Sequence, residues 1–176
     1  FKITHTGIMK VIRQVAKKLN EPYYDIIKKI RSSKVVYVDE TGYRLNGDQW
    51  WLWTFVCEDV VLFVIRKSRS KDVVEEILGK NFDGIISCDG WKIYESFSNR
   101  LQRCWAHLLR ESFHLKEKYK DFEKFHEILK KLFERIIEIR LKPPSEEKRR
   151  ELAEKMRDNL LRTAKQMGKY IHFKKF

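Results

Sequence analysis

Residues 35–65, VVYVDETGYRLNGDQWWLWTFVCEDVVLFVI, constrain the fold of this chain more than any other segment. The segment is rich in β-branched and aromatic residues, which favour strands. Asn46-Gly47 is a strong signal for a two-residue hairpin turn, and Glu58-Asp59 is a weaker one. The segment therefore predicts an antiparallel meander of three strands, over residues 34–39, 49–57 and 60–65.

Helices and two more strands are predicted around this meander. Residues 7–32 carry two apolar stripes separated by Asn20-Glu21-Pro22, which predicts two helices, because proline suits a first helical turn. After the meander the pattern predicts, in order, a helix over 70–79, a strand over 85–88, a helix over 92–97 and a strand over 101–105.

The chain after His107 has helical spacing. Within it, Pro143-Pro144 predicts a break, Ser145 predicts a helix N-cap and Gly168 predicts the end of the last helix. The predicted fold class is therefore α/β, with a mixed five-stranded sheet, flanking helices and an all-α C-terminal part. The predicted regions are a helical lead-in over 1–33, a core over 34–115 and a helical insertion or extension over 116–176.

Two aspartates end predicted strands of the sheet. Asp39 closes the first strand and Asp89 closes the fourth. If the helix over 70–79 forms a right-handed crossover, the fourth strand lies beside the first and parallel to it. Parallel neighbours end at the same edge, where open α/β sheets bind their ligands. We therefore expect Asp39 and Asp89 to lie close together.

Two close carboxylates repel each other unless a cation lies between them. Carboxylate oxygens with open coordination positions suit Mg²⁺ or Mn²⁺, and these metals serve phosphoryl transfer on nucleic acids. The alternative is structural, because an aspartate at a strand end often forms a turn, and Asp89-Gly90 is a common turn pair. The residues by themselves leave both interpretations open.

The charge of the chain favours a polyanionic partner. Its 38 Lys and Arg residues outnumber its 25 Asp and Glu residues, which gives a net charge of +13. No apolar run approaches the roughly 18 residues of a membrane span, so nucleic acid ranks above a membrane. A basic residue taken alone is more often a solvated surface charge. The candidates for phosphate contact are Arg66, Lys67, Arg69, Lys71, Arg103, His107 and Arg110.

Other polar and aromatic side chains near these positions have expected roles of their own. Glu40 is expected on the opposite face of its strand from the preceding aspartate, where it orients the chain or binds a lysine. The spacing of Cys104 and His107 suits zinc, but a closed zinc site needs four ligands, so we expect His107 at the active-site edge instead. Tryptophans could stack on bases, but alternation favours core positions for Trp51 and Trp53.

Three ordered motifs of the chain resemble the transposases of the insertion sequence 66 family: VDETGYRLNGDQWWLW, SRSKDVVEEILGKNFDGIISCDGWKIY and CWAHLLRESF. The resemblance covers about residues 7–115 and is weaker beyond them. It implies a ribonuclease-H-like catalytic domain of the Asp-Asp-Glu type, which uses Mg²⁺ or Mn²⁺ to cut the ends of a mobile element and join them to target DNA. By position it implies that Asp39 is the first metal-binding acid and Asp89 the second, with Trp91 where the family commonly has tyrosine.

The same resemblance implies a third acid, which the family carries downstream in a motif similar to Asn-Asn-x-Ala-Glu-Arg. No such motif occurs before Phe176. Because the members of a metal site act as a unit, we expect the chain alone to be inactive or nearly so. Glu111, on the helix predicted after the fifth strand, is the candidate substitute, and a solvated helix glutamate is the alternative.

The resemblance also implies partners. These are element-end DNA and target DNA, with a homo-oligomer assembled on the DNA and no membrane. Three widely spaced cysteines and the lack of a visible signal peptide favour an intracellular compartment, so we expect a cytoplasmic, nucleoid-associated protein of a prokaryote. Two other functions stay open: a metal-dependent nuclease or resolvase of the same fold, and a non-catalytic remnant that binds DNA or dimerises.

Overall fold

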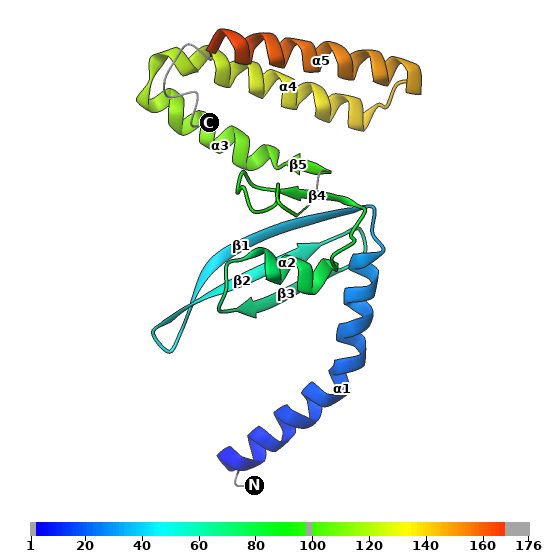
Figure 1. Cartoon of the computed structure of the whole chain (residues 1–176), viewed down its shortest axis with the longest axis vertical. Coiled ribbons are helices and arrows are strands. Elements are labelled where there is room, and N and C mark those ends of the chain that lie inside the picture. The colour runs from blue at the N-terminus through cyan, green and yellow to red at the C-terminus, as the bar shows by residue number, and fades with distance from the viewer. Residues whose placement is uncertain (1–2, 98–99, 168–176) are drawn as a thin grey trace. The chain divides into compact units, whose positions relative to one another are not determined.

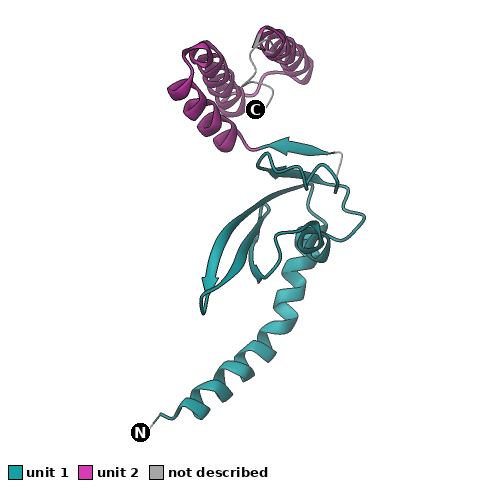
Figure 2. Cartoon of the chain, turned by 60° about the vertical axis from the view of Figure 1, so that its left-hand side comes forward, with its two compact units in different colours: residues 1–103 teal, residues 104–176 magenta. Residues whose placement is uncertain are grey.

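The structure is a computed structural model that describes residues 3–97 and 100–167. It divides the chain into two compact units, residues 1–103 and residues 104–176 (Figure 2). The elements of the first unit are α1 (His5–Arg31), β1 (Val35–Leu45), β2 (Asp48–Val56), β3 (Val61–Arg66), α2 (Lys71–Leu78), β4 (Ile85–Cys88) and β5 (Leu101–Arg103) (Figure 1). Those of the second unit are α3 (Trp105–Lys118), the 3₁₀ helix η1 (Lys120–Phe122), α4 (Glu123–Leu141) and α5 (Glu146–Met167).

The strands of the first unit form one mixed sheet in the order β3-β2-β1-β4-β5. β2 pairs antiparallel with β1 and β3, whereas β4 pairs parallel with β1 and β5. Asn46 and Gly47 join β1 to β2 with φ values of 50° and 88°, the positive values that a tight hairpin turn requires. The predicted meander, the helix that connects it to β4, and the five-stranded mixed sheet are confirmed.

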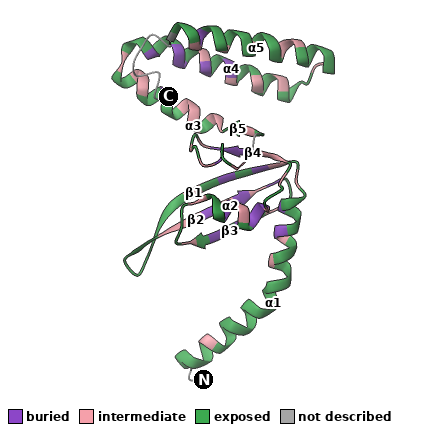
Figure 3. Ribbon diagram, viewed as in Figure 1, coloured by how far each residue is buried: buried purple, intermediate pink, exposed green. Residues whose placement is uncertain are grey.

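Helices α1 and α2 pack on one face of this sheet. That face carries alternate residues of each strand, such as Val38 and Phe55, which pair across the β1–β2 ladder and are buried. Ile30 of α1 and Ile77 of α2 are fully buried in the same hydrophobic cluster. In the first unit, Figure 3 shows the buried residues mainly on the strands and α2, while the N-terminal half of α1 is largely exposed. The core therefore lies between the sheet, α2 and the C-terminal end of α1.

Helix α1 is continuous across Pro22, so the predicted division of residues 7–32 into two helices is wrong. Proline removes one backbone donor and crowds the preceding turn, and both effects disfavour an interior position. Here the chain beyond the proline is anchored, because Ile27 and Ile30 are buried against the sheet. Tertiary packing thus overrides the local signal, and Figure 1 shows α1 curving without a break.

Strand β1 runs past Asp39 to Leu45, so the prediction that Asp39 closes the first strand is wrong. Residues 40–45 pair with β2, whereas the pairing with β4 ends at Tyr37. The polar run after Asp39 is thus kept in the sheet by the long hairpin. Asp39 stands just beyond the point where β1 loses its parallel neighbour and keeps its antiparallel one.

Residues 92–97 do not form the predicted helix. The backbone N–H groups of Tyr94, Glu95 and Phe97 donate to carbonyl oxygens three residues earlier, over 3.3, 3.1 and 3.1 Å, so the segment is a series of turns. Such a short segment makes too few helical bonds to offset the cost of helix nucleation. The fifth strand is also shorter than predicted, because α3 begins at Trp105.

The second unit is helical, as predicted. Phe122, Phe125 and Leu129 form its buried cluster between α3 and α4. The helical structure is interrupted between α4 and α5, at the predicted residues 143–144. At the start of α5, Ser145 Oγ accepts a hydrogen bond from the backbone N–H of Lys148 over 3.4 Å. Gly168, predicted to end the last helix, lies outside the described residues. The predicted regions 1–33, 34–115 and 116–176 stay a prediction.

A helix that crosses a bilayer needs a long and predominantly apolar run of residues. Within residues 3–97 and 100–167, no helix combines the length and the apolar character that crossing a membrane needs.

Candidate active site

The pairing of β1 with β4 brings together the two segments that carry the predicted metal ligands. Its last residue pair is Tyr37 with Ser87. Asp39 and Asp89 each follow that pair by two residues along chains that run in the same direction. The equal offset is the register that two carboxylates need in order to share one ligand at this edge of the sheet.

Each of these two carboxylates has one oxygen engaged by the backbone. Asp39 Oδ1 accepts from the N–H of Glu40 over 3.0 Å, and Asp89 Oδ1 accepts from the N–H of Trp91 over 2.8 Å. No side chain or backbone group of the described residues donates to the Oδ2 atom of either aspartate. One carboxylate oxygen on each side is thus available to a hard cation such as Mg²⁺ or Mn²⁺, so the donor set fits the predicted metal.

Protein ligands alone do not complete such a site. Within the described part of the chain, no group of three or more His, Cys, Asp or Glu side chains is arranged to hold a metal ion. Two carboxylates are nevertheless a normal protein contribution for Mg²⁺, which keeps several waters and takes oxygens from phosphate. Cys104 and His107 therefore have no further zinc ligands near them among the described residues.

Glu40 lies on the buried face of the sheet, opposite Trp53 in the β1–β2 ladder, and only 1% of its side chain is exposed. Arg69 donates to Glu40 Oε1 through Nε and Nη2, over 2.9 and 2.8 Å, and the Tyr94 hydroxyl donates to Oε2 over 2.8 Å. Burial raises the pKa of the Glu40 carboxyl, while the hydrogen bonds from Tyr94 and Arg69 and the charge of Arg69 lower it, and the negative charge of Asp89 raises it further. The expected lysine partner of Glu40 is thus an arginine.

Arg69 is also held by aromatic rings. Its guanidinium carbon lies 4.7 Å from the ring centroid of Trp51 and 4.1 Å from that of Trp91, both within cation–π range. Trp53 is fully buried, and its Nε1–H donates to the carbonyl of Ser68 over 3.2 Å. The predicted core position of Trp53 is confirmed, and Trp51 is partly buried against the same hydrophobic cluster.

Sequence reasoning missed the Tyr94 and Arg69 contacts to Glu40. Tyr94 is 1% exposed, and burial together with the neighbouring Glu40 raises the pKa of its hydroxyl. The available signal was weak, since it consisted of an aromatic residue five positions after Asp89 and an arginine after β3. Contacts between residues this far apart in the chain leave no periodic trace in the sequence.

The other predicted phosphate contacts of the first unit lie in two places. Arg66 is the last residue of β3, Lys67 follows it, and Lys71 is the first residue of α2. Arg66 forms an ion pair with Glu76, which raises the pKa of the arginine and lowers that of the glutamate. The ammonium of Lys67 lies 5.4 Å from the ring centroid of Trp50, and that of Lys71 lies 3.6 Å from Glu75 Oε1.

Arg103 lies beside the turn that follows Asp89. It pairs with Cys88 in the β4–β5 register, and Nη2 lies 3.6 Å from Glu95 Oε1. A Cβ added at Gly90 would come within 2.0 Å of Arg103 Nη1, so the guanidinium occupies the space that a side chain at Gly90 would need. Arg103 is therefore the basic residue of β5 whose side chain reaches the Asp89-Gly90 turn.

The remaining predicted site residues belong to α3 in the second unit. Arg110 and Glu111 are exposed on this helix. His107 is half-buried, and within the described residues its Nδ1 atom is buried and has no hydrogen-bond partner. The roles predicted for His107, Arg110 and Glu111 stay predictions.

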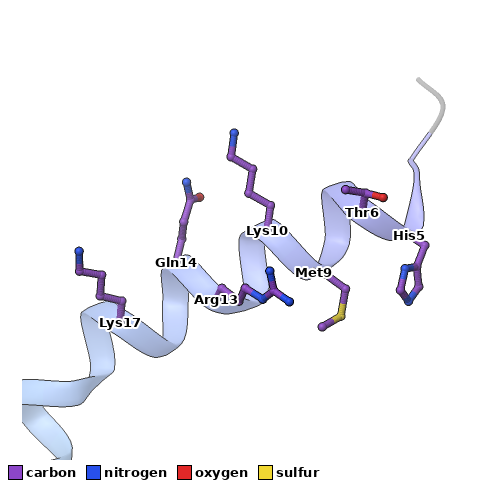
Figure 4. A pocket seen from close by; sticks show the side chains of 7 residues that line it. All are labelled: His5, Thr6, Met9, Lys10, Arg13, Gln14 and Lys17. Carbon is purple, nitrogen blue, oxygen red and sulfur yellow. The ribbon is translucent and has the colours of Figure 1, made fainter.

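A basic face on the N-terminal half of α1 was also missed. Lys10, Arg13 and Lys17 follow one another at helical spacing, and Figure 4 shows their side chains along the exposed helix with those of His5, Thr6, Met9 and Gln14. No acidic residue occurs on α1 before Glu21, and no described carboxylate forms an ion pair with these three cations. The spacing of the basic residues could have revealed this face. The prediction for this helix considered only its apolar stripe.

Comparisons with known proteins identify the family. A family model described as "Transposase IS66 family" matches residues 1–172 of the 176. No curated protein matches the chain, and no solved structure matches it. The resemblance that rested on three short motifs is thus confirmed over nearly the whole sequence, and the chain belongs to the IS66 family of transposases.

Proposed function

We propose that this chain is the catalytic portion of a DNA transposase of the Asp-Asp-Glu type with a ribonuclease-H-like fold, which cuts and joins DNA with Mg²⁺ or Mn²⁺. Membership of the transposase family supports the biological role. The observation that carries the chemistry is the register of β1 and β4, because it gives Asp39 and Asp89 the same offset at one edge of the sheet. A mixed sheet in the order β3-β2-β1-β4-β5 supports the proposed fold.

Asp39 and Asp89 are the proposed metal ligands. Each has an Oδ1 atom fixed by a backbone N–H and an Oδ2 atom free of donors from the described residues. The fixed oxygen limits rotation of the carboxylate, so the free one is held ready for a cation. A divalent ion bound there would lower the barrier to phosphoryl transfer by stabilising the charge on the attacking and leaving oxygens.

Basic residues are the proposed contacts for the DNA backbone. In the first unit these are the predicted contacts Arg66, Lys67, Arg69, Lys71 and Arg103. They are joined by the basic face of α1, whose cations have no carboxylate partner among the described residues. In the second unit they are His107 and Arg110. Phosphate contacts of this kind give affinity without sequence preference and hold the DNA in register. Homo-oligomer assembly on DNA is part of the same proposal.

We also propose that the chain has little activity when tested alone. Asp39 and Asp89 account for two acids of a three-acid site, and loss of one member usually removes most of the activity. Glu111 is the proposed substitute within this chain. A strand-transfer assay with a pre-cleaved element end separates a transposase from a nuclease, because a nuclease gives only hydrolysis.

Metal binding gives the direct test, because it does not depend on activity. Isothermal titration of the chain with Mn²⁺ should show binding that weakens at least about tenfold in Asp39→Asn and in Asp89→Asn. Asp59→Asn is the matched control, since Asp59 is an exposed residue of the β2–β3 turn and loses the same charge. Equal Mn²⁺ affinity in all four proteins would exclude the proposed site.

A further inference from the structure

We infer that Glu40 is a positioning residue for the proposed metal site, and that Arg69 and Tyr94 are the groups through which it acts. The inference rests on the proposed function, because it concerns how Asp39 and Asp89 are held relative to each other. Glu40 follows Asp39 directly in β1, and Tyr94 belongs to the turns that follow Asp89. The Glu40–Tyr94 hydrogen bond of 2.8 Å therefore joins the two acid-bearing segments on the buried side of the sheet.

A second link reaches the same segments through Arg69. Its guanidinium donates two hydrogen bonds to Glu40 Oε1 and lies over the ring of Trp91, 4.1 Å from the centroid. The backbone N–H of Trp91 in turn donates to Asp89 Oδ1 over 2.8 Å. A continuous path of contacts thus runs from β1 at Glu40, through Arg69 and Trp91, to the carboxylate of Asp89.

Burial gives this path its stiffness. The Glu40 side chain is 1% exposed, so its two oxygens cannot turn to water if a partner is lost. Arg69 holds Oε1 and Tyr94 holds Oε2, which fixes the plane of the carboxylate. The Trp51 ring, 4.7 Å from the guanidinium carbon, also limits movement of Arg69. A rigid internal support is what a metal site with only two protein carboxylates needs in order to keep their spacing.

Alternation in β1 separates the two acidic roles. Asp39 pairs with Thr54 and is exposed, whereas Glu40 pairs with the buried Trp53. Glu40 therefore faces the core while its neighbour faces solvent, and both oxygens of Glu40 accept hydrogen bonds from protein donors. Its contribution to metal binding is indirect, through the position of the main chain at Asp39 and at Asp89.

The decisive variant is Tyr94→Phe, because it removes one hydrogen bond and changes no charge. In the full chain we expect its Mn²⁺ affinity, measured by calorimetry and by the Mn²⁺ electron paramagnetic resonance signal, to fall about tenfold to 100-fold. The Mn²⁺ affinity of Glu40→Gln should fall at least as far. Arg69→Lys keeps the charge but loses the planar guanidinium, and its Mn²⁺ affinity should fall by a similar factor. All titrations are run well below the melting temperature of each variant, as measured by circular dichroism.

Two controls distinguish positioning from charge and from general stability. Glu76→Gln removes the same charge as Glu40→Gln and breaks the Arg66–Glu76 ion pair, and it should leave the Mn²⁺ affinity within about twofold of wild type. Tyr24→Phe removes an exposed hydroxyl and should also bind Mn²⁺ normally. If only Glu40→Gln weakens binding, charge alone explains the effect and the inference is wrong.

The outcome also separates this inference from the proposed function. If wild type binds Mn²⁺, Asp89→Asn does not, and Tyr94→Phe and Arg69→Lys bind as wild type, the metal site stands and the positioning role is overturned. If Asp89→Asn binds as wild type, the proposed metal site itself fails. If Glu40→Gln does not fold, Tyr94→Phe carries the test, since it loses a single oxygen from the interior.

Discussion

Asp39 and Glu40 are consecutive residues of β1 that lie on opposite faces of the sheet. Asp39 pairs with Thr54 and is exposed, while Glu40 pairs with Trp53 and its side chain is almost completely buried. Two adjacent carboxylates thus have different environments, because successive side chains of a strand point in opposite directions. The exposed carboxylate keeps an oxygen free for a ligand, whereas both oxygens of the buried carboxylate accept hydrogen bonds from Arg69 and Tyr94.

The core tryptophan should dominate the stability of the first unit. Trp53 is fully buried, so Trp53→Ala is expected to lower the free energy of unfolding by about 3–5 kcal/mol through lost burial and a residual cavity. Phe63→Ala, on the exposed face of the neighbouring strand, should change it by about 0.5 kcal/mol. Urea unfolding followed by circular dichroism measures both, and similar losses would contradict the assigned faces of the sheet.

Replacing the proline in α1 should stabilise the helix. Pro22→Ala restores a backbone N–H that can donate to the carbonyl of Lys18, and it removes a ring that costs about 3 kcal/mol in a helix interior. Amide hydrogen exchange over residues 5–20 should slow markedly in this variant. Glu21→Ala, which changes helix propensity by a few tenths of a kcal/mol only, is the neighbouring control. Unchanged exchange after Pro22→Ala would show that the proline does not limit this helix.

The basic face of α1 should contribute directly to the salt dependence of DNA binding. Each phosphate contact adds about 0.9 to the slope of log affinity against log salt, so Lys10→Gln/Arg13→Gln/Lys17→Gln should reduce the slope by about 2.7. The matched control is a triple change on α5 at positions that are ion-paired with glutamates: Lys148→Gln, Arg150→Gln and Lys155→Gln. Fluorescence anisotropy with a duplex at several salt concentrations gives both slopes, and equal slopes would exclude α1 from the DNA surface.

The second unit should lose stability in mild acid through His126. This residue is buried, and its Nδ1 atom lies 2.8 Å from Ser112 Oγ. Burial lowers the pKa of His126, and the nearby charge of Lys116 lowers it further. The unfolded chain therefore binds more protons than the folded one just below pH 6.5, so the free energy of unfolding falls as the pH drops through this window.

The loss is about 1.4 kcal/mol for each unit by which the His126 pKa is lowered. Thermal melting between about pH 7.5 and 5, followed by the helical signal, should show a smaller decline in His126→Gln than in wild type, because the amide does not titrate. An identical decline in both proteins would assign the acid sensitivity to other groups.

The sequence was most informative where the signals are local. The Asn46-Gly47 turn, the alternation in the strands and the apolar face of α2 follow from residues a few positions apart, and the structure has all three. The position of Asp89 just after β4 was predicted for the same reason. These features need no knowledge of distant contacts.

The predictions failed where tertiary contacts decide. Pro22 was expected in the first turn of a second helix, but burial of Ile27 and Ile30 keeps it inside a single helix. Residues 92–97 have a helix-like pattern, yet Tyr94 reaches back to Glu40 in β1 and the segment forms turns. The partners of Glu40 lie 29 and 54 residues away in the chain, a separation that no local pattern encodes.

The parallel pairing of β1 with β4 has a consequence for the order of folding. The β1–β2 and β2–β3 hairpins close short loops, whereas β4 reaches β1 only after the intervening meander and α2 are spanned, which costs more conformational entropy. We expect the docking of β4 to come late, so Ile86→Val should give a lower φ value than Val64→Ala in refolding kinetics. The two aspartates then come into register only once the rest of the sheet exists, so a half-folded chain lacks the pair of acids of the proposed metal site.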